Sequence, residues 1–106
     1  MVDGLIGEVT DDAFDNLIKQ GVTVVDFFAE WCGPCRTLSP VLAKVADELK
    51  GSVTFVKLDI DKNHMTAQSY HVTSVPTLIL FKDGKEVNRL VGLRDAAAIK
   101  DFAQSA

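Results

Sequence analysis

The segment Trp31-Cys32-Gly33-Pro34-Cys35 decides the fold expected for this chain, because of what lies on either side of it. Residues 23–29 precede it and are apolar on both alternating faces, which is typical of a strand covered on two sides. Residues 38–49 follow it with apolar side chains at helical spacing, and Gly51 ends that pattern. The two cysteines are therefore predicted to lie at the junction between a buried strand and a helix.

The rest of the chain alternates between helix and strand patterns. A helix is predicted from Thr10, which can cap it, to Gly21, and a last helix follows Asp95, which can cap it in the same way. Asp83-Gly84 lies between two strand patterns and is the strongest short-range signal for a tight hairpin. Strand patterns occupy residues 5–9, 53–59, 77–81 and 86–91, and a short helical pattern occupies residues 65–69.

This order of elements predicts an α/β fold. Strands that alternate with helices pair in parallel through right-handed crossovers, and the hairpin adds antiparallel strands. We therefore expect a central mixed β-sheet of about five strands, parallel with an antiparallel hairpin, with helices on both faces. A chain of 106 residues is expected to form a single domain, residues 1–106.

Composition argues against several classes of protein. Fifteen acidic residues against eleven basic ones leave a net charge of −4, so no basic face for nucleic acid or an anionic membrane is expected. Two cysteines are too few for a disulfide-stapled scaffold or an all-cysteine zinc site. His64 and His71 would raise the number of metal ligands to four, but their spacing is not that of zinc modules. We expect no metal.

The beginning of the chain and its apolar runs favour the cytoplasm. The first basic residue is Lys19, so the basic start of a secretory signal is missing. The longest apolar run, residues 75–81, is far shorter than the roughly 18 residues that cross a membrane. Thiols are kept reduced in the cytoplasm, so a close cysteine pair indicates redox or metal chemistry more often than a structural disulfide.

The cysteine pair is placed to perform that chemistry. The first cysteine sits where unpaired amides and the positive end of the helix dipole stabilise a thiolate, which can lower a cysteine pKa from about 8.5 to roughly 3.5–7.5. Pro34 suits a first helical position, and Gly33 lets the backbone of a partner approach closely. We therefore assign Cys32 as the attacking thiolate and Cys35, one turn into the helix, as the resolving thiol.

Residues outside the motif strengthen this interpretation. They are Val25-Asp26-Phe27, Ala29-Glu30, Lys57, Val75-Pro76-Thr77, Phe81-Lys82-Asp83-Gly84 and Val91-Gly92. With them the chain resembles the thioredoxin family over essentially its whole length, and thioredoxin is itself an established example of a lowered cysteine pKa. The resemblance implies the thioredoxin fold and a protein-disulfide reductase without a bound cofactor, working through a reversible Cys32–Cys35 disulfide.

The resemblance also implies partners. These are disulfide-containing client proteins and a thioredoxin reductase, commonly a flavoprotein that draws on NADPH; we expect the chain to be a monomer. Gly33-Pro34 is similar to the reducing members, whereas oxidases and isomerases usually carry a histidine in that interval. An oxidase or isomerase of the same fold remains the alternative enzyme, and a redox-idle binding subunit remains the alternative without activity.

Asp26 is the most informative residue beyond the cysteines. Its strand is apolar on both faces, so Asp26 is expected to be buried with a raised pKa, although an aspartate at a strand end that reaches solvent is the alternative. By the resemblance, Asp26 is a proton acceptor that helps Cys35 become nucleophilic, and Lys57 is its charge partner. From the residues alone, Lys57 is as easily an ordinary lysine with its head in solvent.

Pro76 is unexpected within a strand pattern because proline cannot donate to a ladder. By the resemblance, Val75-Pro76 is a cis bond beside the cysteines, where the backbone of a substrate can pair with Val75. The same resemblance implies an uncharged docking surface formed by Trp31, Gly33, Pro34, Val75, Pro76, Val91 and Gly92. Without it, Trp31 is as easily a core residue and Gly92 a turn residue.

Three residues depart from the usual family pattern. Phe28 stands where many members have a second tryptophan, Ser74 replaces a frequent glycine, and Arg36 replaces a frequent lysine. These differences bear on preference among clients or reductases and not on the exchange chemistry.

Overall fold

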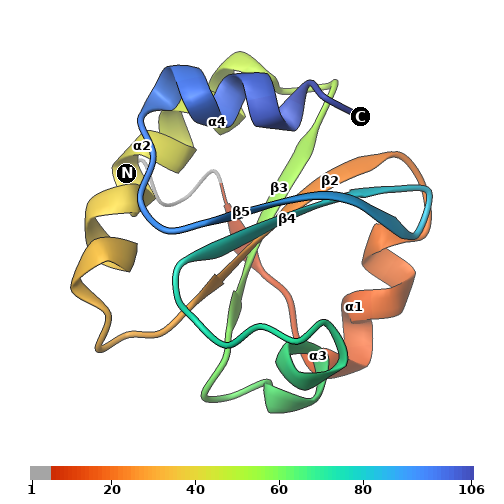
Figure 1. Ribbon diagram of the computed structural model, residues 1–106. Helices are drawn as coiled ribbons and strands as arrows, with labels where there is room; N and C mark the ends of the chain where they lie inside the picture. The colour runs from red at the N-terminus through yellow and green to blue at the C-terminus, as the bar shows by residue number, and fades with distance from the viewer. Residues whose placement is uncertain (1–5) are drawn as a thin grey trace.

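A mixed β-sheet forms the centre of the molecule, and helices cover both of its faces (Figure 1). The computed structural model describes residues 6–106, and within them the chain forms five strands and four helices. In chain order they are β1 (Gly7–Glu8), α1 (Asp11–Ile18), β2 (Val22–Phe28), α2 (Gly33–Glu48), β3 (Thr54–Asp59), α3 (His64–Ser69), β4 (Thr77–Lys82), β5 (Lys85–Val91) and α4 (Ala96–Ala103).

The strands lie in the order β1-β3-β2-β4-β5. β1 and β2 pair with β3 in parallel, whereas β4 pairs antiparallel with both β2 and β5. In the central strand β2, Asp26 therefore lies between Lys57 of β3 and Leu78 of β4. The predicted mixed sheet, with a parallel part and an antiparallel hairpin, is confirmed.

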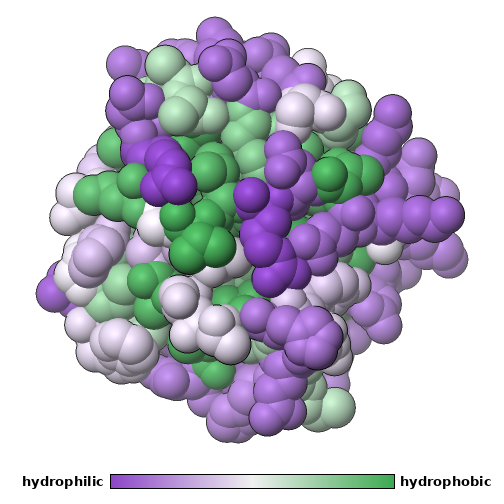
Figure 2. All heavy atoms as spheres, viewed as in Figure 1, coloured by the Kyte–Doolittle hydropathy of each residue, from purple (hydrophilic) through white to green (hydrophobic). Residues whose placement is uncertain are grey.

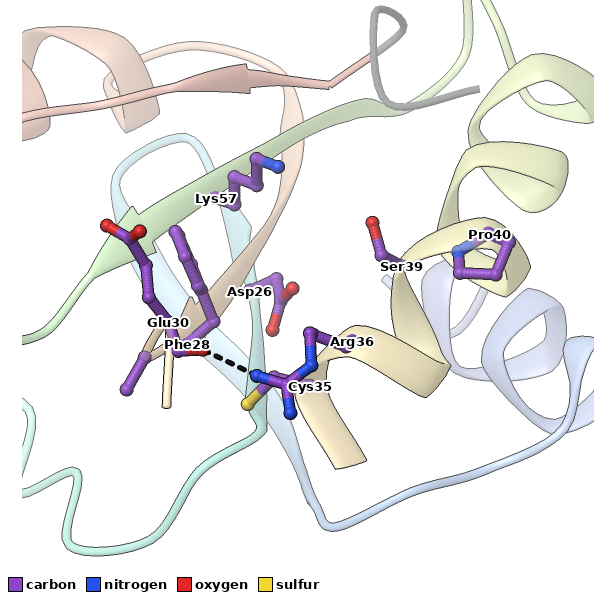
Figure 3. Close-up of a pocket in the computed structure, with 9 residues that line it drawn as sticks. Asp26, Phe28, Glu30, Cys35, Arg36, Ser39, Pro40 and Lys57 are labelled. Carbon is purple, nitrogen blue, oxygen red and sulfur yellow. Dashed lines mark hydrogen bonds between the residues drawn. The ribbon is translucent and has the colours of Figure 1, made fainter. Parts of the chain in front are cut away.

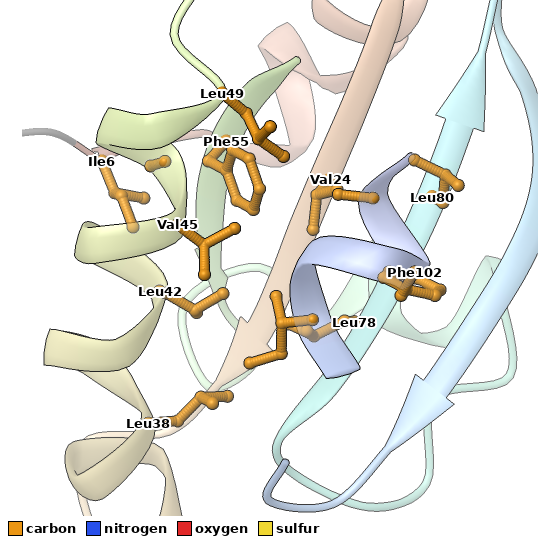
Figure 4. Packing of buried hydrophobic residues seen from close by; sticks show 13 residues of the cluster. Ile6, Val24, Leu38, Leu42, Val45, Leu49, Phe55, Leu78, Leu80 and Phe102 are labelled. Atoms are coloured by element: carbon orange, nitrogen blue, oxygen red, sulfur yellow. The ribbon is translucent and has the colours of Figure 1, made fainter. Parts of the chain in front are cut away.

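Each face of the sheet has its own hydrophobic core. α2 and α4 cover one face, where Leu42 and Phe102 pack with Val24 of β2 (Figure 4). α1 and α3 cover the other face, where Phe14 packs with Val25. Since side chains alternate along a strand, Asp26 shares the face of Val24, beneath α2.

The hairpin between β4 and β5 has the turn that its sequence predicts. Asp83 and Gly84 have φ angles of 49° and 89°, so both central residues are left-handed, as a type I′ turn requires. The turn is also anchored to the segment between α1 and β2, because the Gly21 amide donates to Asp83 Oδ1 at 2.8 Å.

Two predicted helix caps have different outcomes. The Asp95 side chain caps α4 by accepting from the Ala98 amide at 2.9 Å, as expected. Thr10 stands at the N-cap position of α1, but its side chain makes no capping hydrogen bond, so that prediction is wrong in its chemistry. The Ala13 amide, from which the side chain would accept, donates instead to the Thr10 carbonyl at 3.2 Å. The Asp11 amide donates to Asn63 Oδ1 at 2.9 Å.

The strand pattern at residues 5–9 is shorter in the structure than predicted. β1 spans only Gly7–Glu8, although the Val9 amide still donates to the Lys57 carbonyl at 2.9 Å. Leu5 lies outside the described residues. The short helical pattern at residues 65–69 is confirmed as α3, which begins one residue earlier.

Candidate active site

The cysteine pair occupies the start of α2. Cys32 is the N-cap residue, and its Sγ accepts a hydrogen bond from the Cys35 amide at 3.2 Å. The two residues form a disulfide, with their Cα atoms 5.3 Å apart. Pro34 is the second residue of α2, one position later than predicted, where its lack of an amide hydrogen is still harmless. The first sulfur therefore lies where a helix N-terminus stabilises negative charge.

Both cysteines are covered in the oxidised state. Cys32 is 4% exposed and Cys35 is 5% exposed, so burial does not distinguish the two sulfurs. They pack with Ala29, with Val75 at the edge of the cluster. What distinguishes them is the helix: Sγ of Cys32 accepts a hydrogen bond from a first-turn amide.

Asp26 is buried beneath α2, as predicted, and not at a solvated strand end. It is 5% exposed, and its Oδ1 has no hydrogen-bond partner within residues 6–106. Burial raises the pKa of Asp26 from 3.8 to about 7, although the positive charge of Lys57 acts in the opposite direction. A carboxyl group with this pKa can take up or release a proton near neutrality.

Lys57 lies opposite Asp26 in the register of β2 and β3. Its Nζ is 5.4 Å from the centre of the Phe28 ring, and the residue is only partly buried. The long side chain thus lies along an aromatic face while its charge acts on Asp26.

A pocket of about 500 Å³ joins the buried Asp26 to Cys35 (Figure 3). Its lining comes from β2, the loop after it, α2 and β3. The residues are Asp26, Phe28, Ala29, Glu30, Cys35, Arg36, Ser39, Pro40 and Lys57. Asp26 and Cys35 thus line the same space, so a proton passing between them does not have to cross the packed core.

The turn before β4 lies beside the cysteines. The Val75-Pro76 peptide bond is cis, and Val75 packs against the cysteine cluster. The Pro76 carbonyl accepts from the Gly92 amide at 2.9 Å, and Thr77 Oγ1 donates to the Ser74 carbonyl at 2.7 Å. These two hydrogen bonds hold the turn on both sides and bring Gly92 next to it.

Gly92 has a conformation that favours glycine. Its φ is 94°, and a Cβ added there would come within 3.3 Å of Arg94 Nη1. The neighbouring Val91 is 48% exposed at the end of β5. Figure 2 shows hydrophobic residues reaching the surface between hydrophilic ones on the face of the molecule that Figure 1 presents.

Trp31 is not a core residue. It is 67% exposed, and its indole Nε1 donates to Asp61 Oδ2 at 2.8 Å. Asp61 is a contact of the site that the sequence patterns did not indicate. The available signal was its place two residues after the end of β3, because the carboxyl ends of the parallel strands β2 and β3 meet at one edge of the sheet.

The two histidines, His64 and His71, do not line the pocket beside the cysteines. His64 begins α3 and His71 follows it with a φ of 57°, and both are exposed. Over the described part of the chain, no group of three or more His, Cys, Asp or Glu side chains could hold a metal ion. Among residues 6–106 there is also no helix with the length and apolar character needed to cross a membrane.

The fold and the site together define a class of protein. Because the Cys32–Cys35 disulfide closes at a helix N-terminus, where a thiolate is stabilised, this class is the thiol-disulfide oxidoreductases.

Comparisons with known proteins give the family. The thioredoxin family model matches residues 6–105, and the chain belongs to the thioredoxin family. A thioredoxin from Chlamydia pneumoniae is 55% identical over 87 residues, which is 82% of this chain and 84% of that protein. A thioredoxin from Staphylococcus epidermidis is 49% identical over 89 residues, 84% of this chain and 86% of the relative.

A solved structure agrees. A mutant thioredoxin from Halobacterium salinarum NRC-1 superposes with a TM-score of 0.85 at 38% identity, covering 94% of this chain and 88% of that one. The predicted thioredoxin fold is therefore confirmed. Membership of the family makes the chain a protein-disulfide reductase, and the oxidase, isomerase and idle-subunit alternatives are not favoured.

Proposed function

We propose that this chain reduces the disulfides of client proteins with Cys32 as the nucleophile, Cys35 as the resolving thiol and Asp26 as the proton acceptor. The observation that carries the proposal is the Cys35 amide directed at Cys32 Sγ at the start of α2. A hydrogen bond to the charged form, together with the helix dipole, favours the thiolate at this sulfur and not at Cys35.

In the first step the Cys32 thiolate attacks one sulfur of a client disulfide. A bond forms between Cys32 Sγ and that sulfur, the client S–S bond breaks, and the other client sulfur leaves as a thiolate that is then protonated. The product is a mixed disulfide.

In the second step Cys35 releases the client. The Cys35 thiol gives its proton to the Asp26 carboxylate across their shared pocket and attacks Cys32 Sγ. The Cys32–Cys35 disulfide forms, and the second client sulfur leaves with the electron pair of the broken mixed disulfide. Two electrons thus pass from the dithiol to the client. Lys57 supports the charged form of Asp26, which opposes the effect of burial.

Clients would dock on the uncharged surface around the sulfurs. Support comes from the exposure of Trp31 and Val91, from the exposed positions of Gly33 and Pro34 at the helix start, and from the hydrogen bond that joins Gly92 to Pro76. An extended client segment would pair with the backbone of Val75, a form of strand addition in which main-chain hydrogen bonds are sequence-independent.

The cellular setting is also a proposal. The chain would act in the cytoplasm as a monomer, one domain over residues 1–106. A thioredoxin reductase drawing on NADPH would reduce its disulfide after each cycle. Thioredoxin relatives in bacteria and an archaeon support a reductase and disulfide clients in general terms.

A trapping experiment tests the assignment of the two cysteines. With Cys35→Ser, the first step proceeds but the second cannot, so mixed disulfides through Cys32 should accumulate when the variant meets an oxidised client such as insulin. The matched control is Cys32→Ser, which should trap at least tenfold less. Equal trapping by the two variants would contradict the proposed roles.

A further inference from the structure

The pocket beside the cysteines has a buried floor and an exposed rim. Asp26, Ala29 and Cys35 form the floor and are buried, whereas Glu30 and Arg36 at the rim are exposed. The floor also holds the one polar side-chain atom that is buried without a hydrogen-bond partner in residues 6–106, Asp26 Oδ1. Glu30 and Arg36 therefore lie on a path by which water reaches this carboxyl group.

A hydrogen bond joins the two sides of the rim. Arg36 Nη1 donates to the Glu30 carbonyl at 2.6 Å, and this contact links the first turns of α2 to the loop after β2. Figure 3 shows the Arg36 side chain extending from α2 toward that carbonyl, at the pocket that contains Asp26. The Glu30 carboxylate is turned to another partner, Lys62 Nζ, at 3.6 Å.

We propose that Arg36 is a positioning residue that, through its hydrogen bond to the Glu30 carbonyl, restricts the entry of water to the pocket shared by Asp26 and Cys35. Arg36 would thereby keep Asp26 dehydrated and set the pH at which it accepts the proton of Cys35. The inference rests on the proposed role of Asp26 and adds a residue that acts through it.

The groups around Asp26 indicate that Arg36 acts on this carboxyl group through its hydration and not through the charge of the guanidinium. β3 contributes Lys57, α2 contributes Cys35 and Arg36, the loop after β2 contributes Glu30, and β4 contributes the uncharged Leu78. Burial dominates the raised pKa of Asp26, and Lys57 is the charge that opposes it. Loss of Arg36 should therefore act mainly by admitting water, which stabilises the carboxylate.

The test is the titration of the Asp26 carboxyl carbon by NMR in the full-length oxidised protein. In Arg36→Ala the midpoint should fall by about 0.5–1 pH unit, a fraction of the 3–5 units that complete burial can cause. The matched control is Lys44→Ala, which removes an exposed cation from the same helix outside the pocket and should leave the midpoint unchanged. Arg36→Lys keeps the stem and a donor and should retain most of the wild-type value. Since alanine favours helices and both positions are exposed, the variants should fold.

The outcomes separate this inference from the proposed function. An unchanged or raised midpoint in Arg36→Ala, or an equal fall in Lys44→Ala, would overturn it. A second measurement uses Cys32→Ser, in which iodoacetamide should alkylate Cys35 several-fold faster after Arg36→Ala; an unchanged rate would also count against restricted access. Neither readout requires Cys32 to be the nucleophile, which the trapping experiment tests by itself.

Discussion

Two aspartates in neighbouring strands are equally hidden from water but differ in what surrounds them. Asp26 is 5% exposed and Asp59 is 2% exposed. Asp59 Oδ1 accepts from the Asp61 amide at 2.9 Å, and its own carbonyl accepts from the amide and the side chain of Asn63. Asp26 Oδ1 has no such partner in the described part of the chain.

The difference shows that burial alone does not identify a reactive acid. Asp59 uses its oxygen atoms to shape the loop that follows β3, which is a structural task. Asp26 lines the same pocket as Cys35, and its buried Oδ1 has no hydrogen-bond partner in the described residues. A buried polar group left unsatisfied in a native protein is often part of a reactive site. The following predictions test whether the two acids divide their work in this way.

The largest expected effect is on catalysis. Asp26→Ala should slow the release of clients from the mixed disulfide by about 10²–10⁴-fold near neutral pH, because Cys35 loses its proton acceptor. Stopped-flow reduction of a client disulfide measures this step. Asp59→Asn is the control and should stay within a few-fold of wild type; equal losses in both variants would contradict the division of roles.

The next effect is on stability and has the opposite sign from most core substitutions. At pH 8, Asp26→Ala should raise the free energy of unfolding by a few kcal/mol, since it removes an acid whose pKa burial raises from 3.8 to about 7. Urea melts of the oxidised protein provide the measurement.

The same linkage predicts a pH dependence. The folded pKa of Asp26 lies above the unfolded one, so its contribution favours the folded state at low pH and is lost as the pH rises from about 4 to about 7. The stability gap between Asp26→Ala and wild type should therefore widen over this window and be constant above it. A gap that narrows with rising pH would refute the raised pKa.

A smaller effect is expected at the satisfied acid. Asp59→Ala should lower the free energy of unfolding by about 1–3 kcal/mol, because the Asp61 amide loses its acceptor and the loop loses its anchor. Thermal unfolding followed by circular dichroism would show the change. If this variant were more stable than wild type, Asp59 would be as uncompensated as Asp26.

The smallest effect belongs to Asp61, whose carboxylate accepts from the indole of Trp31. Asp61→Leu should change stability by no more than about 0.5 kcal/mol, as is usual for exposed positions. The KM for a protein client should rise a few-fold because the indole is no longer held in place, while the rate with a small disulfide such as hydroxyethyl disulfide should not change. Equal effects on both substrates would show that Trp31 has no role in client docking.

Local sequence patterns predicted most of the sheet and the buried position of Asp26 in the site. The apolar residues on both faces of residues 23–29 were enough to predict that Asp26 is buried, whichever face it takes. Asp83-Gly84 predicted its turn because few residues other than glycine and asparagine or aspartate adopt left-handed φ angles.

Contacts between distant segments could not be predicted in this way. The hydrogen bonds from Trp31 to Asp61 and from Asp11 to Asn63 join residues 30 and 52 positions apart. Short polar side chains at loop ends have many possible partners, and only the packed sheet selects one. Thr10 has a residue type that favours an N-cap, but residue type does not show that the Ala13 amide donates to the Thr10 carbonyl and not to its hydroxyl.

The placement of Trp31 has a practical consequence. It is the only tryptophan in the chain, it adjoins Cys32, and it is both exposed and oriented by Asp61. Since disulfides quench indole emission at short range, opening and closing of the Cys32–Cys35 bond should change the intrinsic fluorescence directly. The redox cycle can therefore be followed in real time by the fluorescence of Trp31, without an added label.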